Sequence, residues 1–322
     1  MARSWSIIPE PQKLTDLVNT LSKAILGKEN VIKQLITGLA AGGHVLFEDV
    51  PGVGKTTLVK ALAQATGCSF KRIQCTPDLL PTDISGVSIY NHKTGEWIFQ
   101  KGPVFTQVLL ADEINRTSPK TQSALLEAMQ EKQVTADGIT FTLEEPFLVI
   151  ATQNPREYEG TFPLPESQLD RFTMRLSLGY PSPESEVLLL KDISRDDLLE
   201  RVEQVMAPEE LIKTREETGK VHVDNSLLEY VTALSTATRE HENVALGISP
   251  RGSLHLVQCA RARAYIQGRD YVLPDDIQEL IAPVFGHRVI LNQAVFFENI
   301  GVSSVLEEIL SRVQVPGNVG ER

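Results

Sequence analysis

The stretch HVLFEDVPGVGKTT, residues 44–57, decides the fold of this chain. Its first four residues, His44–Phe47, predict a buried strand, and the run Leu58–Ala65 that follows the stretch predicts a helix. Between them, Gly52 and Gly54 let successive backbone N–H groups turn toward an anion at a helix N-terminus, where the helix dipole also favours negative charge. This order of strand, glycine-rich loop and helix predicts a phosphate-binding loop in an α/β domain.

The side chains of this loop suit a nucleoside triphosphate bound with Mg²⁺. Lys55 supplies a positive charge for the β- and γ-phosphates, and Thr56 offers a hydroxyl to the ion. The general pattern G-x-x-x-x-G-K-[ST] has glycine where this chain has Asp49. An ordinary glycine-rich turn is the alternative, but strand, loop, Lys-Thr pair and helix all stand in the required order. The residues predicted to bind the nucleotide here are Pro51, Gly52, Val53, Gly54, Lys55, Thr56 and Thr57.

A second predicted strand, Val108–Ala111, runs directly into the carboxylates of Asp112 and Glu113. The first carboxylate can hold hydrated Mg²⁺, and the second can polarise a water that attacks the γ-phosphate. Standing alone, the pair would be interpreted as a strand that ends in two solvated acidic residues. Together with the phosphate-binding loop it predicts a magnesium site with Thr56 and Asp112 as ligands, and Glu113 as the catalytic base.

Two later positions could add to this site. Asn154 follows the apolar run FLVIAT, residues 147–152, and can orient the attacking water, although Asn-Pro also opens turns. Arg171 follows Asp170, and two interpretations stay open. The pair is either a surface ion pair worth less than about 1 kcal/mol, or Arg171 is an arginine finger that reaches the nucleotide site of the next subunit.

Arg251 lies in the first turn of a predicted helix that begins with Ser249 as its N-cap and Pro250 as its first residue. A positive charge in that turn opposes the helix dipole unless an anion lies nearby. The γ-phosphate is the candidate anion, and a solvated arginine is the alternative.

Short apolar runs alternate with amphipathic stretches through about the first 180 residues, which predicts a parallel sheet covered by helices. The expected core strands are His44–Phe47, Phe70–Ile73, Val108–Ala111, Phe147–Thr152 and Phe172–Leu178.

Near Tyr180–Pro183 the composition turns to helix breakers, and patterns of period 3.6 follow. We therefore expect a nucleotide-binding core over residues 1–182 and a smaller helical domain over residues 183–322. Helical patterns of the second part cover residues 184–193, 208–218, 225–238, 250–267 and 274–284.

Two β-hairpins are predicted to interrupt the core, near residues 85–101 and 132–143. The first carries Tyr90, Trp97 and Phe99. These aromatic residues either contact a partner protein or pack within the hairpin.

Composition and charge limit the function classes. The 322 residues are 42% hydrophobic and 23% charged, as in soluble globular proteins. A formal net charge of −11 argues against nucleic acid as a partner, because binding phosphates over a whole surface needs a basic patch. Three cysteines without C-x-x-C spacing fit reduced packing residues in a cytosol. No signal peptide is predicted at residues 1–9, and no run reaches the ~18 apolar residues of a membrane helix, so we expect a cytoplasmic protein without direct membrane insertion.

The order of these motifs resembles the AAA+ ATPases, and most closely their MoxR family, which is related to magnesium chelatase motor subunits. In that family an aspartate at the position of Asp49 is usual. The resemblance implies a P-loop AAA+ core with a central parallel sheet flanked by helices, plus a smaller all-α C-terminal lid domain. The motifs that carry it are EDVPGVGKT (48–56), DEINR (112–116), TQSALLEAMQE (121–131), ATQNP (151–155) and LPESQLDRF (164–172).

The resemblance also implies roles for single residues. Asn154 would be sensor 1, Arg171 the arginine finger and Arg251 sensor 2. The residues that would lie against the adenine are Leu26, Gly27 and Lys28.

By the same resemblance the protein would form a homo-oligomer, a hexameric ring that binds ATP or ADP with Mg²⁺ and has its hairpins directed toward the pore. It would remodel or mature a client protein, often one with a von Willebrand A domain, and in some cases aid metal or cofactor insertion. Two other functions stay open. They are an AAA+ protein that acts on nucleic acid, which the acidic charge disfavours, and a nucleotide-gated scaffold.

Overall fold

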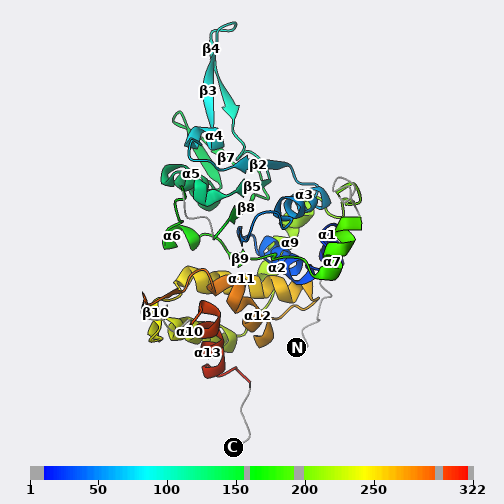
Figure 1. Ribbon diagram of the computed structural model, residues 1–322, viewed down its shortest axis with the longest axis vertical. Coiled ribbons are helices and arrows are strands. Elements are labelled where there is room, and N and C mark those ends of the chain that lie inside the picture. Colours follow the sequence, from blue (N-terminus) through cyan, green and yellow to red (C-terminus); the bar gives the residue numbers. More distant parts are fainter. Residues whose placement is uncertain (1–10, 156–159, 192–198, 294–299, 318–322) are drawn as a thin grey trace, which may run out of the picture.

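The computed structural model describes residues 11–155, 160–191, 199–293 and 300–317 (Figure 1). Its centre is a five-stranded sheet with the strand order β2-β5-β8-β1-β9, in which every pairing is parallel. The five predicted core strands are confirmed, although β9 is shorter than the expected 172–178. The strands are β1 (Val45–Glu48), β2 (Phe70–Gln74), β5 (Val108–Asp112), β8 (Leu148–Gln153) and β9 (Met174–Leu176).

The sheet has a hydrophobic cluster on each face. In β5, Val108 and Leu110 belong to one cluster, while Leu109 and Ala111 belong to the other. Because helices cover both faces, the central strands are continuous apolar runs rather than alternating ones. The first face is covered by α1 (Pro11–Ala24), α2 (Glu29–Ala40) and α3 (Lys55–Ala65), and the second by α4 (Pro81–Ser85) and α5 (Pro119–Glu131).

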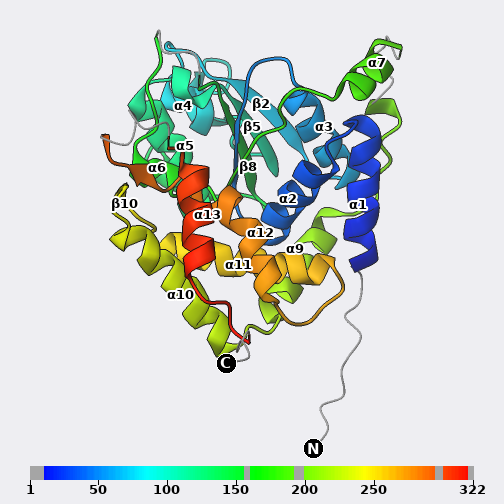
Figure 2. The ribbon, with the colours of Figure 1, turned by 60° about the horizontal axis from the view of Figure 1, so that its bottom comes forward.

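The C-terminal region is helical, as predicted. It also contains α13, which no pattern predicted, and a short antiparallel pair of strands, β10 (Val244–Leu246) and β11 (Ile290–Leu291). Figure 2 shows α11 beside α2 and α9, and one hydrophobic cluster joins these helices. The domain division at residue 182 stays a prediction. The helices are α7 (Pro183–Lys191), α9 (Pro208–Lys220), α10 (Asn225–Glu240), α11 (Pro250–Ile266), α12 (Pro274–Phe285) and α13 (Val302–Arg312).

Both hairpins are present. The first, β3 (Gly86–Asn91) with β4 (Glu96–Lys101), projects from the body of the molecule (Figure 1). The second pairs β6 (Gln133–Ala136) with β7 (Ile139–Thr142). The Phe99 ring of the first stacks on Phe141 of the second, with ring centroids 4.4 Å apart. Phe99 is therefore a packing residue at the base of the projecting hairpin.

Other expectations concern the membrane and the cysteines. In the described ranges, no helix has the length and apolar character needed to cross a membrane. Residues 1–9, where no signal peptide is predicted, lie outside the described residues. Cys68, Cys75 and Cys259 are buried and free, in agreement with a packing role. Burial raises the pKa of the Cys259 thiol to about 12.

The central strand β5 provides a test of the two-sided core. The Leu110 side chain is fully buried, so Leu110→Ala should lower the free energy of unfolding by about 2–5 kcal/mol through lost burial and a residual cavity. Leu254→Ala is the matched control, because the side chain of Leu254 is 63% exposed. Urea denaturation measures both, and equal losses in the two variants would contradict the described core.

Candidate active site

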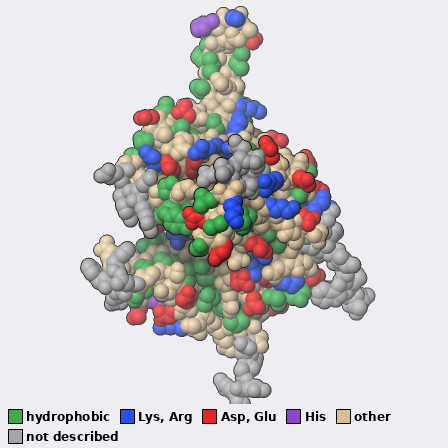
Figure 3. Space-filling model, turned by 45° about the vertical axis from the view of Figure 1, so that its right-hand side comes forward, with side chains coloured by type: hydrophobic (Ala, Val, Ile, Leu, Met, Phe, Trp, Pro, Cys, Tyr) green, Lys and Arg blue, Asp and Glu red, His purple; other side chains and the backbone are tan. Residues whose placement is uncertain are grey.

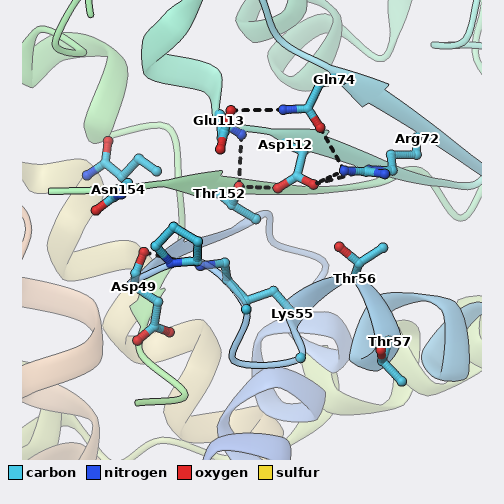
Figure 4. Close-up of a pocket in the computed structure, with 14 residues that line it drawn as sticks. Asp49, Lys55, Thr56, Thr57, Arg72, Gln74, Asp112, Glu113, Thr152 and Asn154 are labelled. Carbon is cyan, nitrogen blue, oxygen red and sulfur yellow. Dashed lines mark hydrogen bonds and ion pairs between the residues drawn. The ribbon is translucent and has the colours of Figure 1, made fainter. Parts of the chain in front are cut away.

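A pocket of about 280 Å³ lies where the carboxyl ends of β5 and β8 meet the loop between β1 and α3 (Figure 4). Carboxyl ends of parallel strands share one edge of a sheet, which is the usual ligand-binding edge of α/β proteins. Asp49, Arg72, Gln74, Thr152 and Gln153 also line this pocket. The predicted site residues that the fold brings together here are Pro51, Gly52, Gly54, Lys55, Thr56, Thr57, Asp112, Glu113 and Asn154.

The loop backbone has the conformation that its glycines allow. Gly52 and Gly54 have φ angles of 83° and 97°, in the left-handed region that favours glycine, and Gly54 directly precedes α3. The Lys55 ammonium donates to the backbone oxygens of Asp49 and Val50, at 3.2 and 2.9 Å. The phosphate-binding loop therefore surrounds a cation at the N-terminus of a helix.

The charge of Lys55 is set by two opposing influences. Burial lowers the pKa of its ammonium, and the nearby carboxylates of Asp49, Asp112 and Glu113 raise it. The acidic pair thus helps keep the lysine charged in a partly buried pocket.

Thr152 joins the acidic pair to the neighbouring strand. Its hydroxyl donates to Asp112 Oδ1 at 2.6 Å and accepts from the backbone N–H of Glu113 at 2.9 Å. Glu113 has a φ of 57°, which is uncommon for a residue other than glycine. Such a backbone persists where surrounding contacts hold it, and it often marks a functional position. The predicted base is therefore placed by β8 as much as by its own strand.

Two side chains of β2 also hold the carboxylates. Arg72 donates through Nε and Nη2 to Asp112 Oδ2, at 3.1 and 2.7 Å. The Gln74 side-chain amide donates to Glu113 Oε2 at 2.9 Å, and its oxygen accepts from Arg72 at 2.7 Å (Figure 4). Sequence reasoning missed both residues. Arg72 and Gln74 are two residues apart on a strand, so their side chains lie on the same face of the sheet. Only the strand order, which makes β2 the neighbour of β5, puts them beside the acidic pair.

Some predicted residues lie outside this pocket. Val53 packs against the hydrophobic cluster. Lys28 Nζ donates to the backbone oxygen of Tyr180 at 2.7 Å, and a Cβ at Gly27 would lie 2.6 Å from Ser185 Oγ. The expected adenine-contacting stretch, Leu26 to Lys28, therefore contacts the segment that follows β9.

Arg171 and Arg251 lie together at a second cavity of about 210 Å³, which Lys132, His44 and His255 also line. Neither arginine lines the first pocket. The cavity therefore presents basic side chains to whatever occupies it.

A partly buried network connects the two chain segments that carry these arginines. Asp170 accepts from Arg288 Nε at 2.7 Å and from the Ser249 hydroxyl at 3.0 Å. Ser249 also caps α11, the helix that carries Arg251. Asp170 is thus paired with Arg288 rather than with Arg171, and the network connects the residue before Arg171 to the helix end before Arg251.

The fold and the first pocket define a P-loop ATPase of the AAA+ type. Residues 44–174 match the family described as ATPase family associated with various cellular activities (AAA), and residues 236–309 match the AAA lid domain.

Similar proteins make the family more specific. The chain is 50% identical to YeaC of Bacillus subtilis, covering 93% of each protein. It is 40% identical to Chaperone MoxR1 of Mycobacterium tuberculosis, over 95% of this chain and 83% of the relative. A crystal structure from Cytophaga hutchinsonii matches with a TM-score of 0.88 and 41% identity, covering 95% of each chain. The chain belongs to the MoxR family of AAA+ ATPases, which confirms the resemblance seen in the sequence.

Three histidines at or near the second cavity have lowered pKa values, so the stability of the protein should depend on pH. Burial lowers the pKa of His44 and of His255 to about 4, and that of His287 well below its ordinary value. The unfolded chain therefore binds protons below pH ~6.5 that the folded chain does not. The free energy of unfolding should fall as the pH is lowered from about 6.5 toward 4, by up to about 1.4 kcal/mol per pH unit for each histidine.

Denaturation at several pH values measures how steeply the free energy of unfolding depends on pH. His44→Asn should lower this slope by the contribution of one histidine, up to about 1.4 kcal/mol per pH unit. His92→Asn, at an exposed position of the first hairpin, should leave it unchanged. A slope that is the same with and without His44 would contradict the prediction.

Proposed function

We propose that this chain is an ATP hydrolase that works at subunit interfaces of a ring and remodels a client protein. The proposal is carried by one arrangement, in which Asp112 and Glu113 face the same pocket as Lys55 and the N-terminus of α3. A nucleoside triphosphate bound with its phosphates at Lys55 would have both carboxylates within its pocket.

The residues present fit a magnesium ion. Thr56 and Asp112 line the same pocket and offer the hydroxyl and carboxylate oxygens that Mg²⁺ prefers. When bound, the ion supplies positive charge to the phosphates. The contact of Arg72 with Asp112 Oδ2 keeps that carboxylate oriented, and its Oδ1 is held by Thr152.

Glu113 accepts the proton of the attacking water in this proposal. Its backbone is fixed by Thr152, and its carboxylate accepts from Gln74, so the group has few orientations available. Asn154 lines the pocket near the end of β8, from where its amide would orient the water. The chain's contribution is therefore positioning and proton acceptance.

Replacement of the base tests the assignment. Glu113→Gln should bind ATP as the wild type does, while its turnover should fall by at least ~100-fold because the amide accepts no proton. Phosphate release and calorimetry measure the two properties. The control Glu131→Gln, at an exposed position, should be fully active. Undiminished turnover in Glu113→Gln would exclude Glu113 as the base.

We further propose that Arg171 and Arg251 serve the nucleotide bound by the adjacent subunit of a hexameric ring. Their common cavity, away from the pocket of their own chain, supports this arrangement. Basic side chains that meet a transferring phosphoryl group stabilise its charge. The network through Asp170, Ser249 and Arg288 would present the two arginines as one unit.

Mixing of inactive subunits tests this sharing. Arg171→Ala mixed with Lys55→Ala should regain activity, because some interfaces combine an intact loop with an intact arginine. Arg251→Ala mixed with Arg171→Ala should regain none if both arginines come from one subunit, since every interface lacks one of them. Phosphate release at varied ratios, with mixed assembly confirmed, measures both. Rescue in the second mixture would show that Arg251 acts on its own chain's nucleotide.

In this proposal the client of the ring is another protein. The ring would act in the cytoplasm. A relative named Chaperone MoxR1 supports a chaperone-like role, and the family resemblance suggests a client with a von Willebrand A domain or a step of metal or cofactor insertion. The projecting hairpin offers a contact surface (Figure 3), since Trp97 is 71% exposed and Ile89 and Ile98 are each 49% exposed.

A further inference from the structure

The carboxylate of Asp49 belongs to the phosphate-binding loop but does not face the acidic pair. In Figure 4 it points away from Asp112 and Glu113. Asp49 is 5% exposed, and its carboxylate binds the segment of residues 177–182, here named the connecting segment, which links β9 to α7. Three donors reach it: the Ser177 hydroxyl at 2.8 Å, the Leu178 N–H at 2.5 Å and the Gly179 N–H at 3.0 Å.

The backbone of the same residue is bound to the nucleotide site. The carbonyl oxygen of Asp49 accepts from the Lys55 ammonium at 3.2 Å, and its N–H donates to Gln153 at the end of β8 at 3.2 Å. Asp49 therefore lies directly between the phosphate-binding lysine and the connecting segment. No other residue is needed to link the two.

A second contact reaches the same region of the chain. Lys28, in the expected adenine-contacting stretch, donates to the backbone oxygen of Tyr180, and Gly27 lies against Ser185. Both stretches expected to hold the nucleotide thus contact residues 177–185. The part of the chain that leads to the C-terminal helices therefore contacts both predicted nucleotide-binding stretches.

A glycine at position 49, as in the general loop pattern, would provide the same backbone groups without any of the three carboxylate bonds. A buried carboxylate is unfavourable unless hydrogen bonds satisfy it, and here backbone and hydroxyl donors do so. The aspartate therefore has a specific effect that the loop alone does not require, which is to hold the connecting segment.

We propose that Asp49 is a positioning residue that transmits phosphate occupancy at Lys55 to the connecting segment and α7. This rests on the nucleotide binding proposed above. A phosphate oxygen is a stronger partner for an ammonium group than a carbonyl oxygen is, so a bound phosphate draws Lys55 away from the backbone of Asp49 and Val50. The released peptide shifts, and the carboxylate on the same residue shifts the connecting segment with it. By thermodynamic linkage, the position of this segment also affects nucleotide affinity.

Hydrogen exchange in the full-length protein tests the coupling, because the N–H groups of Leu178 and Gly179 are themselves the donors to Asp49. Wild-type exchange at these amides should change at least about fivefold between the nucleotide-free protein and protein with Mg·ADP or Mg·AMPPNP. Asp49→Gly and Asp49→Asn should still bind both nucleotides by calorimetry, with an affinity changed by no more than about the coupling factor and far less than in Lys55→Ala. Their exchange at these amides should be faster than in the wild type and independent of nucleotide.

Glu48→Gln is the matched control. Its carboxylate is the neighbouring one in sequence and pairs with Arg175 of β9 at 2.7 Å, but no bond links it to the connecting segment among the described contacts. This variant should keep the nucleotide-dependent exchange. Ser177→Ala removes one of the three donors and should give a partial loss, and it replaces the Asp49 variants if these do not fold.

Nucleotide binding without any change of exchange in the wild type would overturn the coupling alone. A wild-type response in Asp49→Gly would overturn it too, as would a full response in Ser177→Ala where that variant is used instead. If the Asp49 variants lose affinity as severely as Lys55→Ala does, the residue serves phosphate binding only and the coupling is wrong. Absence of nucleotide binding in the wild type would overturn the proposed function itself, and with it this inference.

Discussion

The site depends on the parallel pairing of β8 between β5 and β1. This one arrangement puts Thr152 beside Asp112, and it puts Gln153 beside the start of the phosphate-binding loop. The hydroxyl of Thr152 serves two residues at once, as donor to a carboxylate and as acceptor for a backbone N–H in a left-handed conformation. Loss of that register would separate the loop from the acidic pair, because no other described strand lies between them.

Two carboxylates, one buried and one partly buried, connect the remaining parts of the molecule. Asp49 joins the loop to the connecting segment, and Asp170 joins Arg288 and Ser249 at the second cavity. Each carboxylate is satisfied by several donors, which is the condition for burying charge without a large cost. Both contacts cross between stretches far apart in sequence. Together they place the two ends of β9 and its flanking residues in fixed relation to the loop and to α11.

Much of the core follows from local patterns. The apolar runs predicted all five sheet strands, and the turn residues predicted both hairpins. In the second hairpin, Asp137 and Gly138 occupy the positive-φ positions that a tight hairpin turn requires. The motif residues of the first pocket were also found, because a phosphate-binding loop and a strand that ends in two carboxylates carry their chemistry within a few consecutive residues. Helix α13 and the pair β10–β11 were missed, since their stability comes from packing and pairing with distant segments.

The sequence by itself determined the P-loop, the acidic pair and the family, because each is written in contiguous residues. Only the tertiary structure decided the roles of Arg72, Gln74 and Thr152, and the position of Arg251 beside Arg171 rather than in the pocket of the P-loop. It also showed that the carboxylate of Asp49, where the general loop pattern has glycine, binds the connecting segment. The physical reason is that strand order and helix docking bring these side chains together across long sequence separations, and no local pattern records which strand will be the neighbour of which.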